Sequence, residues 1–227
     1  MMSARDLIIF DCDGVLIDSE VIANRVLGES LLAAGFGATL DEVIEIGLGK
    51  NEKSLRLAVE NAFGRALPDD FMPSTRAQVM RAFSAELRAM QGIPELLGGL
   101  RTPFCVASNS HIDRVRHALR VTGLLPFCEP RIFTAAMVAQ GKPAPDLFLF
   151  AAAQCGAAPS RCLVIEDSVG GIAAAQAAGM PAIGFCGGSH CRAGHLDALR
   201  AVGAWHVCAT IAELGEFLCH EAETAAG

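Results

Sequence analysis

No uninterrupted hydrophobic run in this sequence approaches the roughly 20 residues of a membrane-spanning helix, so we expect no membrane partner. Residues 1–6 lack the apolar segment of a secretory signal peptide, which makes a cytoplasmic location the default expectation. Basic residues are also in the minority, because 18 Lys and Arg stand against 25 Asp and Glu. Nucleic acids bind basic surfaces, so the net charge of −7 argues against a nucleic-acid partner.

Internal repeats and low-complexity linkers are absent as well, and the nine cysteines are scattered along the chain. An odd number of cysteines in mostly apolar surroundings indicates reduced packing thiols rather than a disulfide framework. What the sequence does have is a hydrophobic content of 52% over 227 residues. That is enough for one large domain, or for one domain that carries a smaller inserted one.

Six short apolar segments without polar alternation are typical of strands buried on both faces, and therefore of a parallel sheet. They cover residues 7–10, 104–107, 131–134, 162–165, 182–185 and 207–208. Helical patterns lie between them. Ser110 and Ser168 are placed to cap two helices, and Pro143 and Pro145 suit the start of a helix through 147–155. Strand and helix thus alternate over the second half of the chain, which predicts a doubly wound α/β sheet.

Residues 19–88 break this alternation and carry no convincing strand. The last helix expected there has an apolar face formed by Met80, Phe83, Leu87 and Met90 at helical spacing. The helices predicted for this segment cover 20–34, 41–47, 54–63 and 74–90. We therefore predict a core domain of residues 1–18 and 89–227, and an all-helical cap domain of residues 19–88 over the carboxyl end of the first strand.

Polar side chains stand at the predicted carboxyl ends of the strands, where open α/β sheets bind ligands. The segment Asp11-Cys12-Asp13-Gly14 follows the first strand directly. Two carboxylates beside a hydrophobic sheet repel each other, and a hard cation such as Mg2+ would relieve that repulsion. The later elements supply Ser108, Asn109, Lys142, Glu166, Asp167 and Ser168. Four acids, a lysine and a hydroxyl at a helix start fit phosphoryl transfer.

Each of these residues also has an ordinary structural interpretation. Asp13 and Gly14 alone would indicate a turn, Ser108 and Ser168 could be helix caps, and Lys142 could be a solvated loop lysine. Acids at the start of a helix also complement its dipole. The functional interpretation depends on their joint placement at successive strand ends of one sheet edge.

Four segments, in this order along the chain, resemble the four motifs of the haloacid dehalogenase superfamily. They are Asp11-Cys12-Asp13-Gly14-Val15-Leu16-Ile17-Asp18-Ser19, Ala107-Ser108-Asn109-Ser110, Gly141-Lys142-Pro143-Ala144-Pro145 and Ile165-Glu166-Asp167-Ser168. The likeness covers nearly the whole chain and is to the phosphatase and phosphoglucomutase-like branch. Within that branch the sequence looks most like sugar-phosphate phosphatases of the 6-phosphogluconate phosphatase type. The resemblance implies a Rossmann-like core with an inserted helical cap.

The resemblance also implies a role for each motif residue. Asp11 would attack phosphorus and become an aspartyl-phosphate, and Asp13 would protonate the leaving oxygen and then activate water. Ser108, Asn109 and Lys142 would bind the transferring phosphoryl group. The expected activity is hydrolysis of a small phosphorylated metabolite by a monomer or weak homodimer.

Mg2+ is the cofactor that the resemblance implies. The Asp11 carboxylate, the Asp13 main-chain carbonyl and Asp167 would hold it, and Glu166 would be either a further ligand or an acceptor for metal-bound water. Two cap residues one helical turn apart, Glu20 and Asn24, could face the substrate.

Lys50, in a partly basic loop, is a third cap candidate, and it could reach a sugar hydroxyl or a second anionic group. An exposed cap surface accounts equally well for all three cap residues. Cys186, His190, Cys191 and His195 superficially suit zinc, but paired C-x2-C or H-x3-H spacing is absent and the segment resembles a loop after a strand.

Other functions remain open on the sequence. The alternative enzyme is a phosphosugar mutase of the β-phosphoglucomutase type, but such mutases carry a histidine where this chain has Ala23, and no histidine precedes His111. Dehalogenases of the superfamily lack the second aspartate that Asp13 supplies. A receiver-type signalling domain would have its phosphorylated aspartate near mid-chain and no cap. A silent sugar-phosphate binder would not need every catalytic position filled.

Overall fold

The computed structural model describes residues 5–47 and 50–224. Within these ranges six parallel strands form one sheet in the order β3-β2-β1-β4-β5-β6. The strands are β1 (Leu7–Phe10), β2 (Phe104–Ser108), β3 (Ile132–Thr134), β4 (Cys162–Glu166), β5 (Ala182–Phe185) and β6 (His206–Cys208). The predicted strands and the parallel, doubly wound α/β fold are confirmed.

Strand β1 lies at the centre of the sheet, between β2 and β4. Ile8 and Phe10 pack into the hydrophobic cluster on one face, and Leu7 and Ile9 pack into the cluster on the other face. A strand covered on both faces has no position for a polar side chain, which explains its continuous apolar sequence. The strand order changes direction between β1 and β4, so the carboxyl end of β1 lies at a switch point of the kind where such sheets bind ligands.

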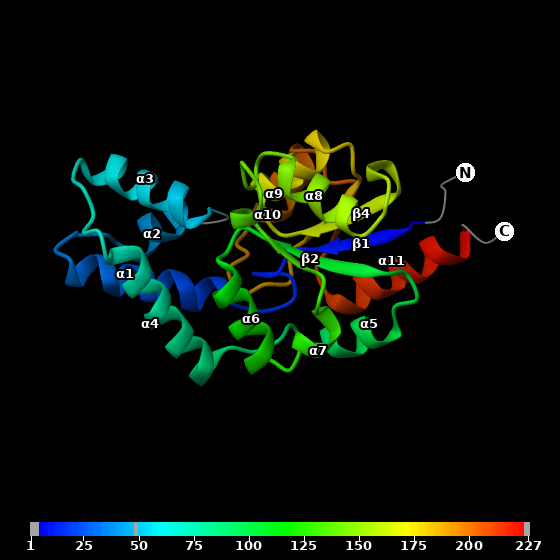
Figure 1. Cartoon of the computed structure of the whole chain (residues 1–227), viewed down its shortest axis with the longest axis horizontal. Coiled ribbons are helices and arrows are strands. Elements are labelled where there is room, and N and C mark those ends of the chain that lie inside the picture. The colour runs from blue at the N-terminus through cyan, green and yellow to red at the C-terminus, as the bar shows by residue number, and fades with distance from the viewer. Residues whose placement is uncertain (1–4, 48–49, 225–227) are drawn as a thin grey trace.

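Helices cover both faces of the sheet (Figure 1). One face carries α5 (Ile93–Gly99), α6 (Ile112–Val121), α7 (Leu125–Cys128) and α11 (Ile211–Thr224). The opposite face carries α8 (Asp146–Gln154), α9 (Val169–Ala177) and α10 (His195–Ala201). Two 3-10 turns, Ala135–Met137 and Pro159–Arg161, come before α8 and β4. Each face buries its own hydrophobic cluster, which makes the sheet a rigid support for the loops at its edge.

Four helices between β1 and α5 form a lobe beside the sheet, at the left of Figure 1. They are α1 (Glu20–Ala33), α2 (Leu40–Gly47), α3 (Glu52–Phe63) and α4 (Phe71–Glu86). This lobe, the cap, has a separate hydrophobic cluster that includes Leu31, Phe36 and Val59. Val26 of α1 and Phe83 of α4 instead join the cluster of the sheet domain. The all-helical cap is confirmed, whereas the domain boundaries at 18/19 and 88/89 stay a prediction.

The last cap helix differs from its prediction at both ends. It begins at Phe71 and ends at Glu86, because Leu87 takes an extended conformation with φ −63° and ψ 140°. Met90 is buried, but not on a helix: its N–H donates to the carbonyl of Leu16 at 2.9 Å. The residues after Glu86 therefore leave the helix and pair through their main chain with the first motif. The helical spacing of their apolar side chains concealed this pairing.

The predicted cap of α6 is also wrong. His111 is its N-cap, with the ring Nδ1 accepting from the N–H of Asp113, and the Ser110 hydroxyl points to Asp13 instead. The predicted cap of α9 is confirmed, because the Ser168 hydroxyl accepts from the N–H of Gly171 at 2.9 Å.

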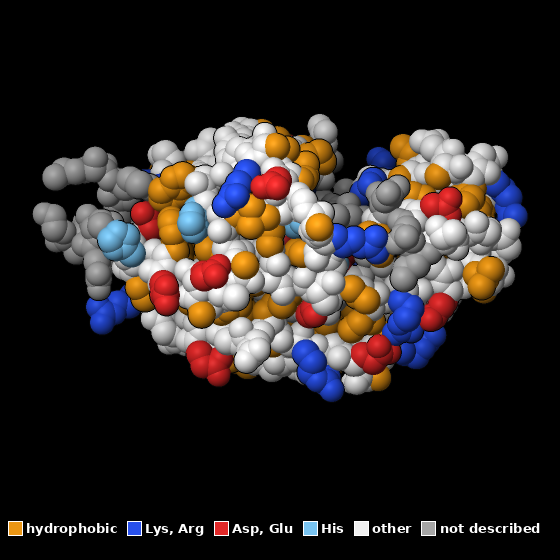
Figure 2. Space-filling view, turned by 180° about the vertical axis from the view of Figure 1, so that it is seen from behind, with side chains coloured by type: hydrophobic (Ala, Val, Ile, Leu, Met, Phe, Trp, Pro, Cys, Tyr) orange, Lys and Arg blue, Asp and Glu red, His pale blue; other side chains and the backbone are white. Residues whose placement is uncertain are grey.

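Among the described residues, no helix combines the length and the apolar character needed to cross a membrane. The expected lack of a leader concerns residues 1–6, of which 1–4 lie outside the described ranges. On the face seen in Figure 2, acidic and basic side chains are interspersed. The absence of a nucleic-acid partner stays a prediction.

Two adjacent glycines at the start of α9 test how tightly this helix packs on the sheet edge. A Cβ at Gly171 would lie 1.9 Å from the carboxyl carbon of Glu166, whereas a Cβ at Gly170 would meet only the Cβ of Pro143, at 4.0 Å. We predict that Gly171→Ala lowers the free energy of unfolding by roughly 1–3 kcal/mol, because Glu166 or the helix must shift. Gly170→Ala should keep or slightly raise it, because alanine favours helix. Equal effects in chemical denaturation would contradict this packing.

Candidate active site

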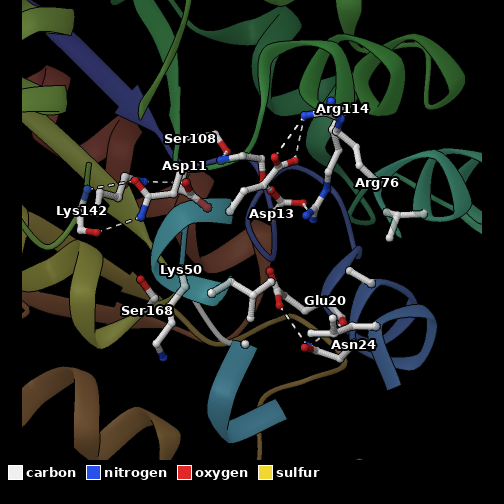
Figure 3. Close-up of a pocket in the computed structure, with 18 of the residues that line it drawn as sticks. Asp11, Asp13, Glu20, Asn24, Lys50, Arg76, Ser108, Arg114, Lys142 and Ser168 are labelled. Carbon is white, nitrogen blue, oxygen red and sulfur yellow. Dashed lines mark hydrogen bonds and ion pairs between the residues drawn. The ribbon is translucent and has the colours of Figure 1, made fainter. Parts of the chain in front are cut away.

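The carboxyl ends of β1, β2 and β4 converge under the cap, around a cavity of about 100 Å³. The sheet domain lines it with Asp11, Asp13, Ser108, Asn109, Lys142, Glu166 and Asp167. The cap lines it with Glu20, Asn24 and Lys50 (Figure 3). The structure thus brings together all the residues proposed for the site from the sequence, while their roles stay predictions.

Lys142 lies at the centre of the site. Its Nζ donates to Oδ1 of Asp11 and to Oε1 of Glu166, each at 2.6 Å, and all three side chains are buried. Burial alone would lower the pKa of Lys142, but the two carboxylates outweigh it and raise that pKa above its usual value. Lys142 therefore stays charged, and it places a buried positive charge at this edge of the sheet.

The loop that carries Lys142 is fixed by Asn109 at the end of β2. The side-chain Nδ2 of Asn109 donates to the carbonyl of Lys142, and its Oδ1 accepts from the N–H of Lys142, both at 2.9 Å. Gly141 permits this close approach, because a Cβ there would lie 2.6 Å from Oδ1 of Asn109. The side chain of Asn109 therefore positions the lysine.

Glu166 is fixed from both sides. One carboxylate oxygen accepts from Lys142, and the other accepts from the N–H and the hydroxyl of Ser168, at 2.8 and 2.9 Å. Ser168 thereby both caps α9 and orients this acid. The sequence suggested only the first of these two functions.

Asp11, Glu166 and Asp167 form a buried acidic cluster, with carboxylate oxygens within 4.8 Å of one another. Burial raises the pKa of Asp11 well above its usual value, and the neighbouring acids add to this effect while Lys142 opposes it. The pKa of Asp167 is raised well above its usual value too, first by burial and then by Glu166. Lys142 contacts two of these carboxylates, and the third, Asp167, contacts the imidazole of His190, so the three acids outnumber the cationic groups beside them. The oxygen donors and the excess negative charge therefore fit a hard divalent cation such as Mg2+.

Asp13 has different surroundings, although it lies only two residues from Asp11. Its Oδ1 accepts from Arg114 at 2.7 Å and from the Ser19 hydroxyl at 2.6 Å, and its Oδ2 accepts from the Ser110 hydroxyl at 2.7 Å. Burial acts to raise the pKa of Asp13, but the Arg114 charge and these hydrogen bonds outweigh it, so the pKa lies below its usual value. In this arrangement Asp13 is ionised.

Sequence reasoning missed Arg114, which connects the site to the cap. Its guanidinium donates to Asp13 and lies 5.3 Å from the ring centre of Phe83 on α4. A weak signal was available, because Arg114 follows Ser110 by four residues and could share a helix face with it. That signal was hidden by placing Ser110 at the helix cap.

Two histidines that the sequence placed in a loop after a strand also lie at the site. The Nε2 atom of His190 lies 3.0 Å from Oδ2 of Asp167, and both side chains are buried. The Nε2 atom of His195 lies 2.6 Å from the main-chain carbonyl of Asp167. The two imidazoles therefore hold the side chain and the main chain of one acid. The available signal was their position after β5, whose carboxyl end lies on the same sheet edge.

Gly14 leaves room for the contact between Asp167 and His190. It has φ +81°, and a Cβ there would lie 1.8 Å from Oδ2 of Asp167 and 2.9 Å from Cε1 of His190. The loop that carries His190 also contacts the start of the cap, because the N–H and the hydroxyl of Ser189 both donate to Oδ1 of Asp18. Gly14, which the sequence suggested as a turn residue, thus also allows Asp167 to pack closely against the chain.

On the cap side, Asn24 donates to the Glu20 carboxylate at 3.2 Å, so these residues share one face of α1 as expected. Burial raises the pKa of Glu20, and the negative charge of Asp13 adds to the effect. Two residues of α4 that the sequence did not suggest, Thr75 and Arg76, line the same cavity. The Thr75 hydroxyl is buried without a hydrogen-bond partner among the described residues, and Arg76 pairs with Glu52 at 3.0 Å.

Known proteins resemble this chain in sequence. A family model described as haloacid dehalogenase-like hydrolase matches residues 5–179. The 6-phosphogluconate phosphatase of Escherichia coli is 32% identical over 83% of this chain and 86% of its own length. Hexitol phosphatase A of the same organism is 32% identical over 75% of this chain and 78% of its own.

Solved structures agree with these sequence matches. A conserved haloacid dehalogenase-like protein of unknown function from Agrobacterium tumefaciens is 38% identical, with a TM-score of 0.81 over 96% of this chain and 100% of that one. The matches therefore extend over both the sheet domain and the cap.

Replacing the central lysine tests the charge balance of the site. Lys142→Met keeps much of the side-chain length but removes the counter-charge of Asp11 and Glu166. We predict a loss of about 3 kcal/mol or more in the free energy of unfolding at neutral pH, because buried carboxylates then lack their partner. Lys53→Met, at an exposed cap lysine, is the control and should change it by less than about 0.5 kcal/mol. A Lys142→Met protein as stable as the control would contradict the central position of the lysine.

Proposed function

The chain belongs to the haloacid dehalogenase-like hydrolases, and we propose that it is a Mg2+-dependent phosphatase that acts on small phosphate monoesters, sugar phosphates in particular, through an aspartyl-phosphate on Asp11. The observation that carries this proposal is the placement of Asp11. Its carboxylate sits at the switch point of the sheet, bound to Lys142 and within the same cluster as Asp167. A nucleophile, a cation for the phosphate and ligands for a metal are thus adjacent.

The proposed reaction has two steps. A carboxylate oxygen of Asp11 attacks phosphorus, the bond from phosphorus to the ester oxygen breaks, and that oxygen takes a proton from Asp13. Water then attacks phosphorus and gives a proton to Asp13, the bond from phosphorus to Asp11 breaks, and inorganic phosphate leaves. Asp11 is then again a free carboxylate, and Asp13 is again protonated, as it was when the first step began.

The surroundings of Asp13 match its second task more directly than its first. Held by Arg114, Ser19 and Ser110, it is ionised and ready to accept a proton as a base. To act as the acid it must first take up a proton, from water or from the monoanionic form of the phosphate ester, and exchange these donors for the ester oxygen. We propose that substrate binding and cap closure bring about that exchange.

Phosphate binding falls to two groups of the sheet domain. The Ser108 hydroxyl accepts from the N–H of Ser110 at 3.0 Å, so its own hydrogen can be donated to a phosphate oxygen. Lys142 supplies the positive charge, and Asn109 holds it in place.

For Mg2+, we assign the Asp11 and Asp167 carboxylates and the Asp13 main-chain carbonyl as ligands. Glu166 already accepts from Lys142 and twice from Ser168, so we assign it as an acceptor for a metal-bound water. When bound, the ion neutralises the acidic cluster and the charge on the transferring phosphoryl group.

The substrate class is inferred from the cap and from the named relatives. The cavity is small, and its cap wall offers carboxylate, amide, hydroxyl and basic groups from Glu20, Asn24, Thr75 and Lys50, which suit a short polyhydroxy chain. Relatives named for 6-phosphogluconate and hexitol phosphates support this class. The mutase alternative is not favoured, because Ala23 lines the cavity and residues 19–88 contain no histidine.

Phosphate release from a panel of sugar and polyol phosphates with Mg2+ tests the proposal. We expect Asp11→Asn to lower turnover by more than about 1000-fold, because the amide is no nucleophile. Asp13→Asn should be nearly as inactive. Asp113→Asn, at an exposed aspartate of α6, is the matched control and should keep full activity. Near-normal turnover of Asp11→Asn, or no phosphate release from any ester by the wild type, would overturn the proposal.

His190 offers a test of the metal site that does not depend on turnover. We predict that His190→Ala weakens Mg2+ binding by about 10- to 100-fold, because Asp167 loses the partner that orients its carboxylate. Calorimetric titration of the protein with Mg2+, without substrate, measures this. His206→Ala, at an exposed histidine of β6, should bind Mg2+ as the wild type does. Unchanged binding by His190→Ala would show that Asp167 needs no such partner.

A further inference from the structure

A second, chemically different cluster of metal ligands lies beside the acidic site. Cys186 follows β5, Cys191 lies in the same loop, and His195 is the first residue of α10. The two sulfur atoms and one ring nitrogen of His195 all lie within 4.8 Å of one another. The sequence suited zinc only superficially, because the C-x4-C-x3-H spacing is no paired motif and the fold of the loop brings these residues together.

The Nε2 atom of His195 already has a hydrogen-bond partner, so Nδ1 is the nitrogen left to bind a metal. Its Nε2 lies 2.6 Å from the main-chain carbonyl of Asp167, and since a carbonyl can only accept, Nε2 carries the hydrogen. The lone pair of the neutral ring is then on Nδ1. Histidines that bind metals in proteins usually donate their other ring N–H to a carbonyl or carboxylate in this way.

The loop also allows a metal ion to enter. Cys186, Cys191 and His195 are each partly exposed, in contrast to the buried carboxylates of the acidic cluster. The sulfur of Cys191 also lies 3.5 Å from Nε2 of His190. Gly187 and Gly188 give the segment between the two cysteines freedom to tighten around an ion.

We propose that Cys186, Cys191 and His195 bind one Zn2+ ion, at a site separate from the Mg2+ site. Two thiolates and an imidazole are the ligands that Zn2+ prefers, and Mg2+ prefers the oxygen ligands of the acidic cluster. Three protein ligands leave the fourth tetrahedral position to water. Because His195 and His190 both contact Asp167, the ion would stiffen the loop that holds this acid.

Cobalt substitution tests the proposal on the full chain. Reduced, metal-free protein is saturated with Mg2+ and then titrated with Co2+. We expect thiolate-to-cobalt charge-transfer absorption that saturates at one ion per chain and disappears when Zn2+ is added. Cys186→Ser and Cys191→Ser should each lower this absorption by half or more, since one of two thiolates is gone, and weaken Zn2+ binding by more than about tenfold. Cys219→Ser, at an exposed cysteine of α11, is the matched control and should keep both.

If a cysteine variant does not fold, alkylation of the wild-type protein tests the same site. In the wild type, Zn2+ should protect Cys186 and Cys191 from alkylation while Cys219 still reacts, as read by mass spectrometry. Charge-transfer absorption at the wild-type intensity in both cysteine variants would overturn the site. So would alkylation unaffected by Zn2+, or a disulfide between Cys186 and Cys191 in freshly purified, unreduced protein.

Discussion

Three carboxylates and one lysine are buried together at the carboxyl end of the sheet, and this imbalance of charge constrains everything around it. Lys142 reaches Asp11 and Glu166 because Asn109 holds its loop, and Glu166 keeps its orientation because Ser168 donates to it twice. Removing charged groups from water costs several kcal/mol for each ion unless it is paired. Lys142 pairs with two of the three carboxylates, and the third, Asp167, contacts His190. The clustered carboxylate oxygens make the site receptive to a divalent cation, and the lysine makes it receptive to a phosphate.

Two aspartates of one short segment have opposite electrostatic environments. The pKa of Asp11 is raised by burial among acids, whereas three donors bring the pKa of Asp13 below its usual value. Such a divergence between neighbouring carboxyls commonly separates two catalytic roles. The divergence arises from different neighbours, because Asp13 contacts Arg114 of α6 and Ser19 before the first cap helix, whereas Asp11 lies among Lys142, Glu166 and Asp167.

Much of this arrangement could be predicted from the sequence, and the errors have identifiable causes. Continuous apolar runs revealed the strands, and the parallel order followed because such runs are covered on both faces. The end of α4 was missed because main-chain pairing of Met90 with Leu16 outweighs the helical spacing of apolar residues. Contacts between distant segments, such as Arg114 with Asp13 and His190 with Asp167, depend on tertiary structure that no local pattern encodes.

The central claim is that the Asp11 carboxylate accepts the phosphoryl group. Beryllium fluoride, which binds to an aspartate oxygen and mimics a phosphoryl group, tests this without any assumption about the substrate. In fluorine NMR spectra with Mg2+, the wild type should show resonances of bound fluoride, and Asp11→Asn should show none. Bound resonances that persist in Asp11→Asn would contradict the account, because another group would then be the acceptor.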